Sequence, residues 1–159
     1  MELATLPMEE LAKILELQLE NGGRASLVVT GNSMYPMLAH RRDSVTLVPV
    51  TAPLRRGDLI LYRRENGQYI LHRIITKPKE GSFLCSGDNQ WVREPVTQGQ
   101  VMALVEGFVR KGRACTGEEL FYRLYVAVWV AMFSVRRPLI RLRRRLGKFR
   151  ADLRGKSNL

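Results

Sequence analysis

The sequence predicts a mainly β domain, α+β overall, in which antiparallel strands form a coiled sheet or small barrel between terminal helices. Short β-prone runs follow residue 26 in close succession: SLVVT, VTLVPV, DLILY, YILHRIIT, SFLCS and VMALVEGFV. Turn-forming groups separate them, including Arg56-Gly57-Asp58, Glu65-Asn66-Gly67 and Ser86-Gly87-Asp88-Asn89. This spacing favours an antiparallel arrangement over an array of βαβ units.

Three segments are predicted along the chain. Residues 1–25 form an N-terminal amphipathic helix, in which apolar residues recur at helical spacing: Leu6, Leu11, Ile14, Leu15 and Leu19. Residues 26–112 form the β-domain, where LYRRENGQYILHRI predicts a hairpin with Asn66-Gly67 in its turn. Residues 116–159 combine an apolar helix with a basic amphipathic tail.

Charge is distributed unevenly along the 159 residues. The formal net charge is +11, but residues 136–159 hold ten Lys and Arg against one acid, Asp152. The remainder of the chain therefore carries only +2. A strongly basic protein often binds nucleic acid, but here the charge belongs to the tail and not to the predicted β-domain.

The cysteine and histidine content indicates neither a disulfide framework nor a metal site. Cys85 and Cys115 lie far apart in sequence and form no CxxC motif, which fits a reducing compartment. Only two histidines are present, without paired ligand spacing. We expect no metal and no cofactor.

A candidate nucleophile lies in the stretch VVTGNSMYPML, where Ser33 follows an apolar run and precedes a proline turn. A serine hydroxyl needs a neighbouring base. His72 lies in the middle of a predicted strand, whereas His40 lies in the polar segment LAHRRD and is predicted to be a surface residue. Asp88 lies in a glycine turn after an apolar strand. Each residue alone has an ordinary structural explanation.

Their order along the chain carries more information. The boxes GNSMYP, RRGDLILY, LHRI and SGDNQ follow one another between about residues 26 and 110. In these boxes the sequence resembles the signal peptidase and LexA-like clan of serine endopeptidases, and within it the endoplasmic-reticulum and archaeal type of signal peptidase. The family pattern is G-x-S-M-x-P, then G-D-apolar, then H-R, then G-D-N. The resemblance implies a signal peptidase/LexA-like β-fold and peptidase activity.

The resemblance also implies roles for individual residues. Ser33 matches the nucleophile, His72 the general base, and Asp88 the carboxylate that orients His72. Met34 and Pro36 match structural positions, the first packing beneath the serine and the second fixing its turn.

One position departs from the family pattern. Many signal peptidases have a serine two residues before the nucleophile, and this chain has Gly31 there. The oxyanion hole would then depend on backbone N–H groups, including that of Ser33, with Thr30 or Asn32 as further donors. Asp58, in the G-D-apolar box, is predicted to hold a turn near the site.

The apolar run at residues 124–135 is too short for a simple transmembrane anchor. Twelve helical residues span about 18 Å, against a hydrocarbon core of about 30 Å. Beyond Pro138 an apolar stripe, formed by Leu139, Leu142, Leu146 and Phe149, runs among many Lys and Arg residues. We predict an anionic membrane surface as a partner of this tail, and nucleic acid as the weaker alternative.

The N-terminus lacks the basic start and apolar run of a secretory signal. We therefore expect the protein in the cytoplasm or at the cytoplasmic face of a membrane. Three functions remain open. The first is a serine peptidase that cleaves a protein or leader peptide near the membrane. The second is a degenerate peptide-binding module without turnover, and the third is a membrane or nucleic-acid adaptor that acts through the tail.

Overall fold

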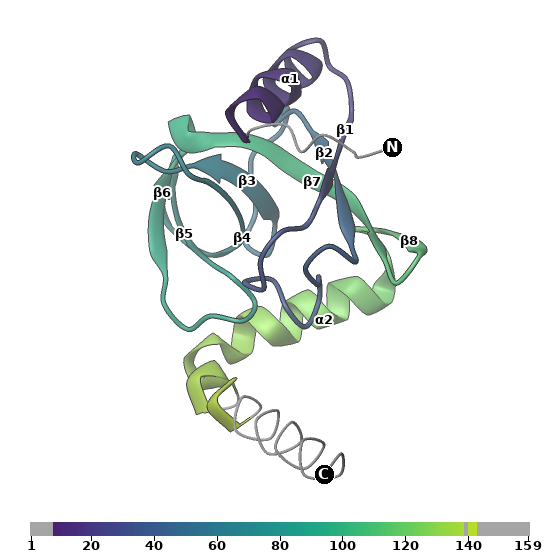
Figure 1. The fold of residues 1–159 in the computed structure, drawn as a ribbon. Helices are drawn as coiled ribbons and strands as arrows, with labels where there is room; N and C mark the ends of the chain where they lie inside the picture. Colours follow the sequence, from purple (N-terminus) through teal and green to yellow (C-terminus); the bar gives the residue numbers. More distant parts are fainter. Residues whose placement is uncertain (1–7, 139, 143–159) are drawn as a thin grey trace, which may run out of the picture.

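The structure, a computed structural model, describes residues 8–138 and 140–142. A curved antiparallel sheet lies between two helices (Figure 1). The elements are α1 (Met8–Glu20), β1 (Ala25–Val28), β2 (Ser44–Val48), β3 (Leu59–Arg63), β4 (Tyr69–Lys79), β5 (Ser82–Ser86), β6 (Glu94–Thr97), the 3-10 helix η1 (Gln98–Gln100), β7 (Val101–Arg110), β8 (Arg113–Thr116), α2 (Leu120–Ala131) and the 3-10 helix η2 (Met132–Val135). Residues 136–138 and 140–142 are also helical.

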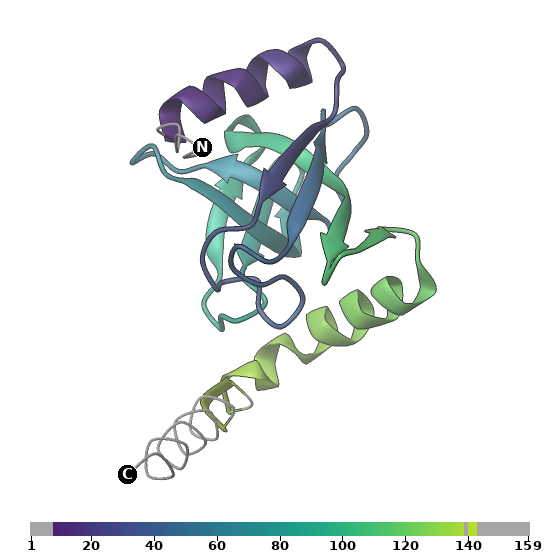
Figure 2. The same cartoon turned by 45° about the vertical axis from the view of Figure 1, so that its right-hand side comes forward.

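All strand pairs are antiparallel, and the sheet has the order β1-β2-β7-β3-β4-β5-β6, with β8 paired to β7. The sheet curls into a half-barrel (Figure 2). This confirms the predicted mainly β architecture with a coiled antiparallel sheet. In this order β1 has one neighbour, β2, so its other edge is unpaired within the described sheet.

The predicted β3–β4 hairpin is confirmed. Its loop is closed by a hydrogen bond from Arg64 N to Gln68 O (2.8 Å), and Gly67 N donates to Arg64 O. Gly67 has φ +83°, a left-handed conformation that glycine adopts without strain. A three-residue loop with a left-handed last residue is a common hairpin connection.

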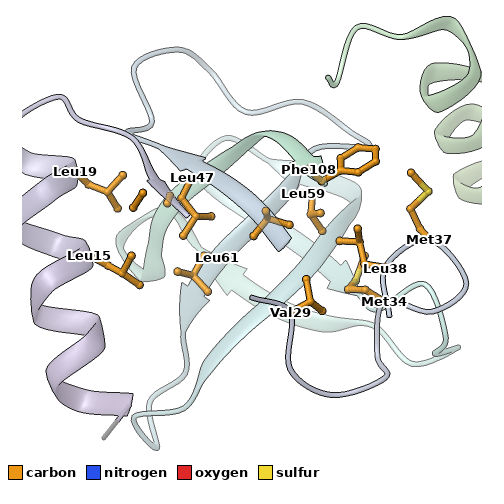
Figure 3. Close-up of a cluster of buried hydrophobic side chains, with 13 residues drawn as sticks. Leu15, Leu19, Val29, Met34, Met37, Leu38, Leu47, Leu59, Leu61 and Phe108 are labelled. Atoms are coloured by element: carbon orange, nitrogen blue, oxygen red, sulfur yellow. The ribbon is translucent and has the colours of Figure 1, made fainter. Parts of the chain in front are cut away.

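The principal hydrophobic core lies inside the curve of the sheet and includes both methionines of the Ser33 loop (Figure 3). Its buried members are Leu15, Leu19, Ala25, Val29, Met34, Met37, Leu38, Val45, Leu47, Leu59, Leu61, Ala103 and Phe108. Leu15 and Leu19 belong to α1, so the N-terminal helix packs on the β-domain. Leu6, predicted on the same helix, lies outside the described residues.

Helix α2 packs beneath the end of the sheet that carries the Ser33 loop (Figures 1 and 2). A Cβ atom at Gly57 would stand 2.7 Å from Val126 Cγ1, so this helix lies directly against the turn before β3. From the sequence we predict α2 and the basic tail as one segment, separate from the β-domain. In the structure, the side of α2 that faces the sheet packs as part of the folded domain. No helix in residues 8–138 and 140–142 is long and apolar enough to cross a bilayer. Of the predicted tail stripe, Leu139, Leu146 and Phe149 lie outside the described residues.

Candidate active site

Ser33 lies in a loop that three apolar side chains anchor in the core. Met34, Met37 and Leu38 are each at most 3% exposed, and Leu38 N donates to Met34 O at 3.0 Å. Ser33 itself is only partly buried. The predicted packing of Met34 beneath the serine is therefore observed, and Pro36 follows in the same turn. The anchored loop holds one hydroxyl at a fixed place on the surface.

Gly31 has a conformational reason to be glycine. Its φ is +81°, where a side chain would be strained. Its N–H donates to His40 Nδ1 at 2.8 Å, which ties the start of the loop to its end. His40 is exposed, as the sequence predicted. A serine at position 31 would meet no other atom but would be strained in this backbone conformation.

His72 is buried on β4, with only 3% of its surface exposed. Its Nδ1 lies 3.0 Å from Glu94 Oε1 and 3.1 Å from the Tyr62 hydroxyl, and that hydroxyl in turn donates to Glu94. Glu94 begins β6, and Tyr62 lies on β3, two residues beyond Ile60, which pairs with His72. A carboxylate at Nδ1 favours a proton on that nitrogen and leaves Nε2 with a free lone pair.

Ser33 and His72 meet at Gly87. A Cβ atom built on Gly87 would stand 3.0 Å from Ser33 Cβ and 3.1 Å from His72 Nε2. These two atoms are therefore no more than about 6 Å apart. A side chain at position 87 would occupy space next to both Ser33 Cβ and His72 Nε2. The structure thus brings together the predicted nucleophile and the predicted base.

Asp88 does not orient His72, contrary to the role inferred from sequence. Its two carboxylate oxygens are engaged by Arg73, with Nε–Oδ1 and Nη2–Oδ2 distances of 2.9 Å. The Tyr125 hydroxyl also donates to Oδ2 at 3.0 Å. The carboxylate that contacts the imidazole is that of Glu94. Asp88 acts on His72 only through space, where its negative charge raises the pKa of the imidazole.

The Arg73–Asp88 pair is fully buried and joins three parts of the chain. Arg73 Nη1 donates to Gly57 O (2.9 Å) and to the Tyr122 hydroxyl (3.0 Å). Trp129 Nε1 donates to the Asp88 carbonyl at 3.1 Å. Strand β4, the turn before β3 and helix α2 are therefore fastened around the loop that carries Gly87.

Asn89 connects this loop with the Ser33 loop. Its N–H donates to Ser33 O at 2.7 Å, and its side-chain Nδ2 donates to Asn32 O at 3.1 Å. Among the described residues the Ser33 N–H has no hydrogen-bond acceptor, so it remains available as an oxyanion donor. Asn32 is exposed, and its predicted part in the oxyanion hole stays a prediction.

Burial and charge set the protonation of the site. The pKa of His72 is lowered to about 4, first because burial disfavours the imidazolium and second because of the positive charge of Arg64. Burial raises the pKa of Glu94. Arg64 forms an ion pair with Glu94, with an Nη2–Oε2 distance of 2.7 Å. His72 is therefore neutral at pH 7, the form that can accept a proton.

Two clefts adjoin residues of the site, one at Ser33 and one at Glu94. One has a volume of about 370 Å³ and is mostly apolar. It is lined by Ser33, by residues of α1, β1, β3 and β4, and by the chain after β1: Leu15, Leu27, Val28, Val29, Thr30, Met34, Leu61, Tyr69 and Leu71 among them. The other measures about 310 Å³ and is lined by Arg64, Glu94 and residues 89–92.

The remaining candidate groups contribute no chemistry here. Asp58 Oδ2 accepts a hydrogen bond from Arg55 N at 2.6 Å, so this residue holds a turn, as predicted. Cys85 is buried, and burial raises the pKa of its thiol to about 12, which keeps it protonated. Within residues 8–138 and 140–142 no three His, Cys, Asp or Glu side chains are grouped as metal ligands.

Comparison with known protein families and with curated proteins finds no match for this chain. The resemblance to the signal peptidases therefore stays a prediction from the four sequence boxes.

We predict that Asp88→Asn destabilises the fold. The substitution leaves Arg73 buried beside an amide that cannot accept both of its hydrogen bonds, and breaking a buried pair costs about 3–5 kcal/mol. Urea unfolding followed by circular dichroism measures this loss. Glu80→Gln, an exposed acid at the β4–β5 turn, is the control and should change the unfolding free energy by less than about 0.5 kcal/mol. Equal unfolding curves for the two variants would show that the pair does not hold the loop.

Proposed function

We propose that this protein is a serine endopeptidase of the signal peptidase type. Ser33 is the nucleophile, His72 the general base, and Glu94 the carboxylate that orients the imidazole. The observation that carries the proposal is the meeting of Ser33 Cβ and His72 Nε2 at Gly87, because nucleophile and base come there from separate parts of the chain. The substrate is a protein or peptide.

The proposed reaction follows from the two nitrogens of the imidazole. Nε2 takes the proton of the Ser33 hydroxyl while the oxygen attacks the scissile carbonyl carbon. The Ser33 N–H stabilises the oxyanion, and Glu94 at Nδ1 stabilises the imidazolium. His72 then gives its proton to the leaving amine, which breaks the peptide bond. Water hydrolyses the acyl-enzyme by the same proton relay in the second half of the reaction.

The open edge of β1 supports binding of an extended substrate. β1 leads into the Ser33 loop, and its residues Leu27 and Val28 line the apolar cleft. A peptide that pairs with this edge gains backbone hydrogen bonds and places alternate side chains in the cleft. Its chain then runs past Ser33 toward the cleft beside Glu94. This arrangement favours cleavage within a chain over removal of a terminal residue.

Removal of either reacting group should abolish cleavage. The probe is a peptide library prepared from a proteolysed proteome, with new termini identified by mass spectrometry. We expect the wild-type chain to produce new termini, and Ser33→Ala and His72→Ala to produce none, while circular dichroism shows intact folds. For the best-cleaved peptide, Glu94→Gln should lower kcat by about 10²–10⁴. Cleavage that survives Ser33→Ala would refute the mechanism, and peptide binding by the wild-type chain without products would assign the site to binding alone.

Gly87→Ala should lower cleavage per folded molecule sharply, and it should also lower the unfolding free energy, because the atom nearest to the added methyl group is a backbone oxygen, Ser33 O. The added methyl group would stand 2.5 Å from Ser33 O and about 3 Å from both reacting side chains, so one of them must move. Moving a reacting group by about 1 Å costs about a hundredfold in rate. Gly99→Ala is the matched control, since a Cβ there meets no atom within 4 Å. Equal kcat/KM values for the two variants would mean that the reacting groups do not meet at Gly87.

The pH profile should reflect the burial of His72. Because its pKa is lowered to about 4, the base stays neutral on acidification until the pH approaches that value. We expect kcat/KM to be flat from pH 7 to about pH 5 and to fall about tenfold per pH unit below about pH 4. Arg64→Gln removes a charge that lowers this pKa and should move the midpoint upward. A wild-type midpoint near 6.5, the value of an exposed histidine, would contradict this description of the base.

A further inference from the structure

Helix α2 has a second apolar face, which points away from the domain. Large apolar side chains on it are between 36% and 80% exposed: Leu120, Phe121, Leu124, Val128 and Met132, followed by Val135 in η2. Successive helical residues turn by about 100°, so the five residues of this set up to Met132 occupy about one third of the circumference. The side of the helix that faces the domain begins next to this arc and carries Tyr122, Tyr125 and Trp129, which make the hydrogen bonds to Arg73 and Asp88.

From Leu120 onward the charges along this face are all positive, although Glu118 and Glu119 directly precede the helix. Between residues 120 and 142 the sequence has no Asp or Glu. Arg123, Arg137 and Arg141 are exposed along the same stretch. The sequence from residue 136 to the end adds a net charge of +9. An apolar face bordered by arginines complements a surface that is apolar beneath a layer of negative charge.

We propose that the outward face of α2 docks in the interfacial layer of a membrane that contains anionic lipids. Phe121, Leu124 and Val128 enter the boundary between headgroups and acyl chains, while the arginines bind lipid phosphates. The helix spans about 18 Å and lies in the membrane plane, since it is too short to cross a core of about 30 Å. A second copy of the chain fits this face less well, because a symmetric contact brings together the exposed Arg123, Arg137 and Arg141 of both copies. The nearest acids in sequence are Glu118 and Glu119, and Glu119 already pairs with Arg113.

Docking would place the candidate active site next to the membrane. The inner face of α2 holds the loop of Gly87 and Asp88, and Arg136 Nη1 donates to Gly87 O at 3.5 Å. The loop is therefore separated from the lipid by about one helix diameter, roughly 10 Å. If the proposed peptidase function is correct, the substrate is a segment that emerges at a membrane surface. The docking itself does not depend on that function.

Vesicle flotation of the full chain tests the docking. The probes are vesicles of pure phosphatidylcholine and vesicles of phosphatidylcholine and phosphatidylglycerol in equal parts. We expect binding to the anionic vesicles, and a loss of at least about tenfold in the partition coefficient for the double variant Phe121→Ser/Leu124→Ser. The matched control is Ile14→Ser/Leu17→Ser, which removes two exposed apolar side chains from α1 and should bind like the wild type. Ser33→Ala should also bind normally, which separates docking from peptidase activity.

Three results would overturn the proposal. The first is equal binding by the wild type and the Phe121→Ser/Leu124→Ser variant, since the basic tail alone would then account for membrane affinity. The second is a dimer in sedimentation velocity that this variant dissociates, since the face would then be covered by a second copy. The third is no binding to anionic vesicles by a wild-type chain whose fold is intact by circular dichroism.

Discussion

The buried ion pair between Arg73 and Asp88 is the constraint on which the site depends. Arg73 directly follows His72 on β4, and neighbouring strand residues point to opposite faces of a sheet. His72 therefore faces the Ser33 loop while Arg73 faces helix α2 and the turn at Gly57. Because Asp88 directly follows Gly87, fixing its carboxylate also fixes the glycine beside which the hydroxyl and the imidazole meet. In each of the two dipeptides, His72-Arg73 and Gly87-Asp88, the first residue lies at the candidate active site and the second belongs to the buried ion pair.

The cost of desolvation explains why the buried Arg73–Asp88 ion pair has so many hydrogen-bond partners. Two charges removed from water are costly unless their remaining donors and acceptors are satisfied. Arg73 meets two carboxylate oxygens, a carbonyl and a tyrosine hydroxyl, and its guanidinium lies 5.6 Å from the centre of the Tyr122 ring. Helix α2 supplies both tyrosines and the tryptophan of this arrangement. The helix is thus required for the charged pair to be buried, and the pair in turn holds the helix on the domain.

Local patterns predicted most of the sheet and part of the site. The β-prone runs correspond to β1–β5 and β7, since these strands contain alternating or continuous apolar residues between turn formers. The short strands β6 and β8 were missed. Pro95 interrupts β6, and three of the four β8 residues are exposed, so neither has an apolar pattern. Ser33 and His72 were recognised because each lies in a distinctive box.

Glu94 was missed because its position depends on strand register. It pairs with Cys85 across the β5–β6 ladder, and β5 pairs with β4, which carries His72. Asp88 is closer to His72 along the chain, but these strand pairings bring the Glu94 carboxylate to the imidazole instead. The role of α2 was hidden for a similar reason. A helix with apolar residues on both faces does not disclose from its sequence which face packs on the domain.

The charges around His72 have opposing effects on its pKa, and their balance fits the role of general base proposed for it. Burial and Arg64 keep the imidazole neutral at rest, while Asp88 favours its protonated form through space. Glu94 contacts Nδ1 directly but is paired with Arg64 on its other oxygen, which divides its negative charge between two cations when the imidazolium forms. A more exposed histidine would be a stronger base in water, yet it would be partly protonated near neutral pH and free to turn away from Ser33. Burial between Tyr62 and Glu94 lowers the basicity of His72 and fixes the orientation of its ring. In the proposed reaction, the nearby carboxylates would recover part of this loss as the imidazolium forms.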